Sequence, residues 1–433
     1  MTRRRIAACG LLVAVALVAG ACGNAWGVHN AASGESPGVT PTEIIVGGVA
    51  SITSPVGDNF KYAAEGVKAY FEMVNSEGGV YGRKLRLVAE YDDNTQASKN
   101  IAAVRTLVEE DGVFAVMPVA TPIFAGGPYL AEARVPTFGW VINPEWALSD
   151  ALFGGGNDGD ICLDCAETFT YLPMIAKLMG AERVGVVAYS AAQSKQCAEG
   201  QQAALDKFGF DVPFADSSLT FGFTDVSAQV ARIKDADLEL LATCMDGDGS
   251  ARLSKALNEA GVKLKQYWPI GYDPNLLEQF PDEMEGIYVQ TTFVPFEIPG
   301  SSAGMKKYLD WVDRTGGQVG EASMQGWLNA DLFVAGLKEA GPEPTREKLI
   351  EGIYSLTDYD ADDIILPVDW TKMRDADKGF NKGDVVPVCL GFVTVDDAEF
   401  KPVFVTEEEP WACVDISKNT LPSEPQRPKD LGL

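Results

Sequence analysis

The sequence contains a single histidine, His29, which lies in a stretch rich in small and polar residues near the N-terminus. A Ser-His-Asp triad, a Cys-His pair and a histidine general base each need an imidazole in the folded part of the chain. A structural zinc site needs four ligands of the cysteine or histidine type. The 62 acidic residues are too many for any one glycosidase-like carboxylate pair to stand out. We therefore expect a protein that is not an enzyme and that holds no metal or cofactor.

The chain is also short of basic residues and, beyond its N-terminus, of long apolar runs. Its 35 Lys and Arg stand against 62 Asp and Glu, which gives a formal net charge of −27 at pH 7. A surface this acidic does not attract nucleic acid or an anionic membrane by charge. No later segment offers the roughly 18 consecutive apolar residues that a membrane-spanning helix needs.

The first 21 residues have the pattern of a secretory signal peptide. Three arginines at positions 3 to 5 precede an apolar run from Leu11 to Val18 and the small residues before Cys22. The segment "LVAGAC" resembles the lipobox of bacterial lipoproteins, in which that cysteine becomes an acylated N-terminus; the alternative is ordinary signal cleavage. Acylation of Cys22 would anchor the exported protein to the outer face of the cell membrane. Residues 22–42 would then be the lipidated cysteine and a flexible tether.

Removal of the signal peptide leaves 412 residues, enough for two or three domains. Strands alternate with helical patterns of about 10 to 15 residues, which predicts βαβ units and parallel sheets with both faces covered. After a Gly/Asp-rich break the pattern restarts, so we expect an α/β fold with two doubly wound lobes that divide near residue 156. The expected strands are 43–50, 84–91, 113–119, 137–141, 183–189, 238–244, 267–272 and 286–293, and the expected helices are 59–77, 98–110, 124–133, 197–208, 250–260, 305–315, 327–340 and 345–353.

Six cysteines remain outside the signal peptide and the anchor, and an even number in an exported protein predicts disulfides. Cys389 and Cys413 lie where they would bridge strand ends in a β-rich C-terminal hairpin. Cys162 and Cys165, in "DGDICLDC", are expected to staple a loop. Their alternatives are pairing with other cysteines or the redox centre of an exported thiol oxidoreductase.

Several consecutive segments carry a family resemblance. "EIIVGGVASITSPVGDNF", "NSEGGVYGRKL", "YDDNTQAS" and "LVEEDGVFAV" resemble the first lobe of extracytoplasmic solute-binding proteins of branched-chain amino acid ABC importers, which have the type I periplasmic-binding fold. The resemblance implies two lobes joined by a three-crossover hinge, with a solute clamped in a cleft between them. It places residues 43–156 and about 296–358 in lobe 1, residues 157–295 and about 359–415 in lobe 2, and residues 416–433 in a C-terminal tail.

The family's ligand positions in lobe 1 map onto three loops of this chain. In "PVATPIF", Thr121 matches a hydroxyl that holds the ligand carboxylate; in "GWVINPEW", Ile142 stands where the family has a threonine. Trp140 and Phe60 are candidates for a more apolar wall. The opening loop supplies Thr53, Ser54, Asp58 and Asn59 as further contacts, although Asp58 is equally suited to cap the helix that follows it.

In lobe 2 the resemblance points to the loops "SAAQSKQCAEG", "CMDGDGS" and "GYDPN". Cys197 and Cys244 fall near two positions where the family has aromatic residues, and loops that both face the cleft would bring them within disulfide distance. Asp273 is the candidate acid for a ligand ammonium group, and Tyr272 is the candidate aromatic wall.

The resemblance also implies the partners. These are a small organic solute, such as an amino acid or a related amphipathic compound, and the permease and ATPase subunits of an ABC importer, with the binding protein itself a monomer. A sensory receptor for a small ligand and an exported thiol oxidoreductase are the alternative functions.

Overall fold

The computed structural model describes residues 36–54, 59–154, 171–375, 379–380, 388–415, 418 and 420–433. Contacts divide the chain after Gly34, and Glu35–Leu433 forms one unit. Cys22, Asp58, Cys162 and Cys165 lie outside the described residues, so the anchor, the cap and the CxxC staple stay predictions.

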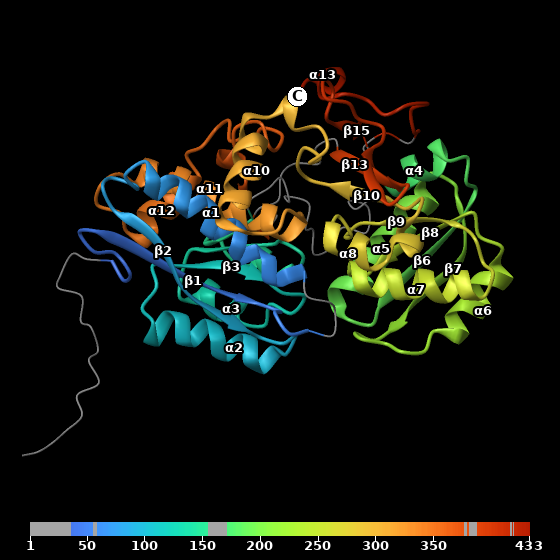
Figure 1. Ribbon diagram of the computed structural model, residues 1–433, viewed down its shortest axis with the longest axis horizontal. Helices are drawn as coiled ribbons and strands as arrows, with labels where there is room; N and C mark the ends of the chain where they lie inside the picture. The colour runs from blue at the N-terminus through green and yellow to red at the C-terminus, as the bar shows by residue number, and fades with distance from the viewer. Residues whose placement is uncertain are drawn as a thin grey trace, which may run out of the picture. The chain divides into compact units, whose positions relative to one another are not determined.

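The first sheet has five parallel strands in the order β2-β1-β3-β4-β5. Figure 1 labels β1, β2 and β3 of this sheet. Its central strand β3 is buried along its whole length, as expected for a parallel strand with helices on both faces. Side chains of β3 reach both faces of the sheet: Met117 belongs to the apolar cluster with α1 and α11, whereas Val116 and Val119 belong to the cluster with α2 and α3. Strict alternation is broken here, because the pairing register shifts between Val116 and Val119. The strands are β1 (Glu43–Ala50), β2 (Lys84–Asp92), β3 (Ala115–Ala120), β4 (Thr137–Gly139) and β5 (Leu152–Gly154).

The helices of the first sheet come from two distant parts of the chain. Helix α1 packs against α11 so closely that a Cβ at Gly66 would lie 1.8 Å from the Ser323 carbonyl oxygen, and one at Gly326 1.9 Å from that of Ala63. Glycine at both crossing points is what lets the two backbones meet. The elements on this sheet are η1 (Asn59–Tyr62), α1 (Ala63–Ser76), α2 (Ala97–Arg105), the π-helical turn η2 (Thr106–Glu110), α3 (Gly127–Glu132), η3 (Pro144–Leu148), α10 (Ala303–Thr315), α11 (Glu321–Ala340) and α12 (Arg346–Ile353).

The second sheet has the order β14-β13-β10-β9-β8-β6-β7, and β15 also pairs with β13. Strands β6 to β10 are parallel, whereas β13 runs antiparallel to β10, β14 and β15. The strands are β6 (Arg183–Tyr189), β7 (Asp211–Leu219), β8 (Leu240–Cys244), β9 (Lys265–Trp268), β10 (Tyr288–Thr291), β13 (Val388–Asp396), β14 (Glu399–Pro402) and β15 (Ala412–Val414).

Helices α6 and α7 cover one face of the second sheet, and α4 and α5 cover the other. The remaining elements are α4 (Leu172–Leu178), α5 (Ala192–Lys207), α6 (Ser227–Ala236), α7 (Gly247–Glu259), α8 (Pro274–Gln279), α9 (Pro281–Met284), η4 (Pro299–Ser301), η5 (Trp370–Lys372), the small pair β11 (Arg374–Asp375) and β12 (Gly379–Phe380), and α13 (Pro428–Leu431). We call the first sheet with α1–α3 and α10–α12 lobe 1, and the second sheet with α4–α9 lobe 2. The residue boundaries given above for the lobes and the hinge stay predictions.

The predicted disulfide at the C-terminal hairpin is confirmed. Strands β13 and β14 form the hairpin, and Cys389 of β13 lies in register opposite Cys413 of β15. The two sulfur atoms are 2.02 Å apart. This bond fastens β15, and the chain that follows it, to the second sheet.

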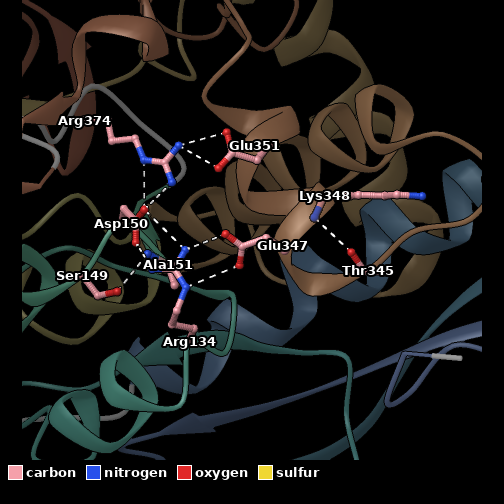
Figure 2. Close-up of polar contacts among 9 residues, drawn as sticks. All are labelled: Arg134, Ser149, Asp150, Ala151, Thr345, Glu347, Lys348, Glu351 and Arg374. Atoms are coloured by element: carbon pink, nitrogen blue, oxygen red, sulfur yellow. Dashed lines mark hydrogen bonds and ion pairs between the residues drawn. The ribbon is translucent and has the colours of Figure 1, made fainter. Parts of the chain in front are cut away.

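A charge network holds α12 and the segment after η5 to the loop before β5, as Figure 2 shows. The side chain of Asp150, only 7% exposed, accepts hydrogen bonds from Arg134 Nη1 at 2.6 Å and from Arg374 Nη2 at 2.6 Å. Arg134 also pairs with Glu347, and Arg374 with Glu351, both on α12. Burial raises the pKa of Asp150, but the two arginines outweigh burial and hold the pKa below its ordinary value. The carboxylate is therefore charged and shared between three segments of the chain.

Candidate functional site

The carboxyl ends of β1, β2 and β3 are tied together by a buried polar network. Asp93, which is fully buried, accepts hydrogen bonds from Ser51 Oγ at 2.7 Å, Thr95 N at 2.9 Å and Asn100 Nδ2 at 2.9 Å. Ser51 Oγ is also 3.1 Å from Thr121 Oγ1 in the loop after β3. One carboxylate thus fixes the loops after two strands and the start of α2.

The neighbouring carboxylate of Asp92 fixes the opening loop. It accepts hydrogen bonds from Ile52 N at 3.0 Å, Thr53 N at 3.2 Å and Asn94 N at 2.8 Å, and from the Thr53 hydroxyl. Burial raises its pKa, but these hydrogen bonds more than offset burial, so the pKa lies below its ordinary value. The "YDDNTQAS" segment therefore shapes this edge of lobe 1.

The three hydroxyl side chains expected to bind the solute are engaged within this network. Thr121, 1% exposed, accepts from Ile123 N at 3.1 Å in addition to its bond with Ser51. The Thr53 hydroxyl contacts Asp92, and the Ser54 hydroxyl contacts that of Thr95. Direct contact of these hydroxyls with a solute stays a prediction, and their observed contacts hold loops.

An apolar cluster lies next to the polar network and contains residues from both lobes. Phe60 and Trp140 form its centre, with ring centroids 5.3 Å apart, and both are at least 95% buried. Phe221 follows β7 and Ile270 follows β9, so these two side chains come from lobe 2. We call this set the interlobe cluster; its members are Ala50, Ile52, Phe60, Tyr62, Ala63, Ala120, Trp140, Ile142, Phe221, Ile270 and Ala322.

Tyr272 and Asp273 are not members of the interlobe cluster. Tyr272 is fully buried, its ring stacks on that of Phe296 with centroids 4.7 Å apart, and its hydroxyl contacts Glu297 and accepts from Phe296 N at 2.8 Å. Asp273 caps α8, because its Oδ1 accepts from Asn275 N at 2.8 Å. These contacts belong to the core and to a helix N-terminus, respectively.

The predicted Cys197–Cys244 disulfide is confirmed. The Cα atoms are 5.9 Å apart, inside the expected range, and the S–S distance is 2.00 Å. The bond joins α5 to the last residue of β8. One helical turn before Cys197, Gln193 Nε2 donates to the Pro122 carbonyl oxygen of lobe 1 at 2.5 Å.

Asp246 lies two residues after Cys244 and is a buried acid at the same edge of lobe 2. Its carboxylate caps α7 by accepting from Gly249 N at 3.1 Å, and it accepts from the Tyr189 hydroxyl at 2.5 Å. Burial raises the pKa of Asp246 to about 6, and these hydrogen bonds offset only part of that effect. The folded protein therefore takes up a proton here in a pH range where an ordinary aspartate stays ionised.

This shift predicts a pH-dependent effect of Asp246→Asn. The folded-state pKa lies above the ordinary value of 3.8, so the protonated form favours folding, and that contribution is lost as the pH rises through about 6. Asparagine is also a good helix cap. We expect the variant to be more stable than the wild type at pH 7.5 by on the order of 2 kcal/mol, with a much smaller difference at pH 4. Urea unfolding of both proteins at the two pH values measures this, and an unchanged difference would contradict it.

The structure thus brings only part of the predicted site together. Thr53, Ser54 and Thr121 share the polar network, and Trp140, Ile142 and Phe60 share the interlobe cluster. Asn59 begins η1, but its side chain lies outside the described part. Sequence reasoning missed Phe221, Ile270 and Gln193. The quoted loop "SAAQSKQCAEG" contains Gln193, but nothing in its spacing distinguishes that residue.

Within the described ranges, no helix is both long and apolar enough to cross a membrane. In the same ranges, no three His, Cys, Asp or Glu side chains are grouped so that they would hold a metal ion.

Two α/β lobes, one with a parallel sheet and one with a mixed sheet, whose strand-end loops meet around a shared apolar cluster, define a two-lobed α/β binding protein. The chain belongs to the periplasmic binding protein family, whose model matches residues 43–385. This confirms both the predicted fold class and the resemblance to the solute-binding proteins of branched-chain amino acid importers.

Three relatives illustrate the similarity. Leu/Ile/Val-binding protein homolog 3 from Brucella melitensis is 26% identical over 244 residues, which are 53% of this chain and 64% of the relative, so less than two thirds of that protein is matched. A fatty acid ABC transporter substrate-binding protein from Thermomonospora curvata is 20% identical with a TM-score of 0.71, over 90% of this chain and 98% of that one. A leucine binding protein from Thermotoga maritima is 17% identical with a TM-score of 0.68, over 83% and 97% of the two chains. At these identities the two solved structures support the fold alone.

Proposed function

We propose that this protein is the substrate-binding component of an ABC importer and that it closes its two lobes on a small solute with an apolar body. The observation that carries the proposal is the interlobe cluster, in which Phe221 and Ile270 of lobe 2 pack against buried side chains of lobe 1. In parallel sheets, ligands bind outside the carboxyl ends of the strands, and this cluster forms there. Movement of the lobes about a hinge would expose or cover these side chains.

The chemistry of the cluster favours a solute that needs no ammonium group. The members of the cluster carry no charge. A solute that contacts them therefore gains binding energy mainly from the burial of apolar surface. The acid expected to hold an ammonium group, Asp273, caps α8 through Oδ1 and is not a member of the cluster. The Thermomonospora curvata relative is by its name a substrate-binding protein of a fatty acid ABC transporter, whereas the Brucella melitensis relative is by its name a homolog of Leu/Ile/Val-binding proteins. We propose an apolar carboxylic acid in preference to an amino acid.

A thermal-shift screen tests this proposal. The protein from Gly23 onward is unfolded and refolded with its disulfides intact, which strips any carried solute. The panel pairs compounds that share a skeleton and differ in the ammonium group: 4-methylpentanoate with leucine, and 3-phenylpropanoate with phenylalanine. A bound solute at a hundredfold excess over its Kd stabilises the folded state by about 2.7 kcal/mol. We expect shifts from the acids and smaller shifts or none from the amino acids.

The panel is extended to dicarboxylates, amides and sugars. The absence of a thermal shift with every compound would contradict a solute-binding function. It would favour the thiol oxidoreductase alternative, which free-thiol titration tests directly. The remaining parts of the proposal are acylation at Cys22, attachment to the outer face of the cell membrane, a monomeric state, and delivery to membrane permease and ATPase subunits. The signal-peptide and lipobox pattern supports the first two, and membership of the binding protein family supports the last. A sensory receptor would bind the same solute and differ only in its partner.

A further inference from the structure

Hydrogen bonds join the two lobes directly: one runs from Glu321 N of α11 to the Tyr272 carbonyl oxygen at 3.1 Å, and another joins α5 to the loop after β3. Gln193 lies in the first turn of α5 in lobe 2, and its Nε2 donates to the Pro122 carbonyl oxygen of lobe 1 at 2.5 Å. The same carbonyl accepts from Asn143 Nδ2 at 2.9 Å, and Asn143 is 2% exposed. The acceptor is therefore held in place from within lobe 1 before lobe 2 reaches it.

The loop that carries the acceptor is rigid for a second reason. Thr121 Oγ1 accepts from Ile123 N and contacts Ser51, so the residues on both sides of Pro122 are fixed. A rigid carbonyl group that faces the other lobe is a suitable hydrogen-bond acceptor for a contact that forms when the lobes close. Little conformational freedom is lost when such a hydrogen bond forms.

The donor is held in place by the disulfide. Residues four apart lie on the same face of a helix, so Gln193 and Cys197 share one face of α5. Cys197 is bonded to Cys244 at the end of β8, and Ser194, next to Gln193, is buried. The disulfide therefore fixes the first turns of α5 relative to the sheet of lobe 2.

From this geometry we infer that Gln193 is a closing contact between the lobes and that the Cys197–Cys244 disulfide positions it. The inference rests on the proposed function, because closure matters only for a protein that closes on a solute. Gln193 is a positioning residue here: it stabilises the closed arrangement of the lobes and needs no contact with the solute.

Small-angle X-ray scattering of the protein from Gly23 onward, with no solute added, tests this inference. Gln193→Ala removes the donor, and Gln193→Glu places a carboxylate against the carbonyl. Loss of one net hydrogen bond changes an equilibrium by about fivefold, so we expect the ratio of closed to open molecules to fall about fivefold and the radius of gyration to rise. The control is Gln202→Ala, which removes a hydrogen bond made within α5, from Gln202 Nε2 to the Ala198 carbonyl oxygen. Equal scattering from the wild type and both Gln193 variants would overturn the inference.

The role of the disulfide is tested by a double-mutant cycle. Cys197→Ser with Cys244→Ser should lower the closed fraction in the wild-type background and have little further effect when Gln193 is alanine. Removal of the other disulfide, by Cys389→Ser with Cys413→Ser, should leave the closed fraction unchanged. Effects that simply add would overturn the link between the disulfide and Gln193. Because scattering needs no solute, a negative thermal-shift screen refutes the proposed function without affecting this result.

Discussion

Replacement of Asp93 by alanine is expected to lower the free energy of unfolding by about 3–5 kcal/mol, because it leaves several buried donors without an acceptor. Asp93 is fully buried and accepts from the Ser51 hydroxyl, the Thr95 amide and the Asn100 side chain. Asn100 in turn accepts from Gly126 N at 2.8 Å, so the loss extends to the loop before α3. Urea unfolding followed by circular dichroism measures the change.

Asp92→Ala is the matched control for this prediction. It removes the same charge one residue away and a similar number of hydrogen bonds, but Asp92 is only partly buried. Water can replace its lost bonds, so we expect a cost of about 1 kcal/mol. Equal losses from the two substitutions would contradict the view that Asp93 is the buried centre of the network.

Replacement of Phe221 by alanine is expected to weaken binding of the solute by about 10- to 100-fold, which corresponds to the apolar surface of one large side chain. Phe221 belongs to lobe 2 and contacts the lobe 1 side chains of the interlobe cluster. The free energy of unfolding should change much less than the affinity, because Phe221 is partly exposed. Titration calorimetry with 4-methylpentanoate measures the change.

Phe223→Ala is the control for Phe221→Ala. The two phenylalanines are two residues apart, both are half-buried, and both rings lie near that of Tyr189, with centroid distances of 4.7 Å for Phe221 and 6.3 Å for Phe223. Only Phe221 belongs to the interlobe cluster. Affinity that falls equally in both variants would mean that the loop, and not the cluster, determines binding.

Elements with strong local patterns were predictable from the sequence. The apolar face expected for the first helix, with Val67, Phe71 and Val74, is the buried face of α1. The glycines expected to end that helix do so: Gly79 N donates to the Val74 carbonyl oxygen at 2.9 Å, and Gly79 has a φ of 77°. In both cases the determining interactions are close in sequence.

Strand β7 was missed because its pattern is weak. Asp211–Leu219 contains Pro213 and three Asp or Ser residues in a row from Asp216, and most of its side chains are at least partly exposed. Among the described strands it lies at the edge of the second sheet and pairs with β6 alone. An edge strand of this kind is stabilised by its neighbour more than by its own apolar residues.

Candidate site residues were easiest to predict where they follow a strand closely. Trp140 and Ile142 follow β4 and share one apolar cluster with Phe60, whereas their contact with a solute stays a prediction. The location of Tyr272 depends instead on Phe296, 24 residues further along the chain, and a stacking partner at that separation leaves no periodic signal. Gln193 was missed for the same reason, since its acceptor is 71 residues away in the other lobe.

The central claim is that this protein binds an apolar acid and does not need an ammonium group. The most direct test is a pair of calorimetric titrations of the refolded protein, one with 4-methylpentanoate and one with leucine, which share the same branched skeleton. The account predicts that 4-methylpentanoate binds at least tenfold more tightly, a difference of about 1.4 kcal/mol in binding free energy. Tighter binding of leucine would contradict it, and would show that an acid of lobe 2 still receives the ammonium group of an amino acid.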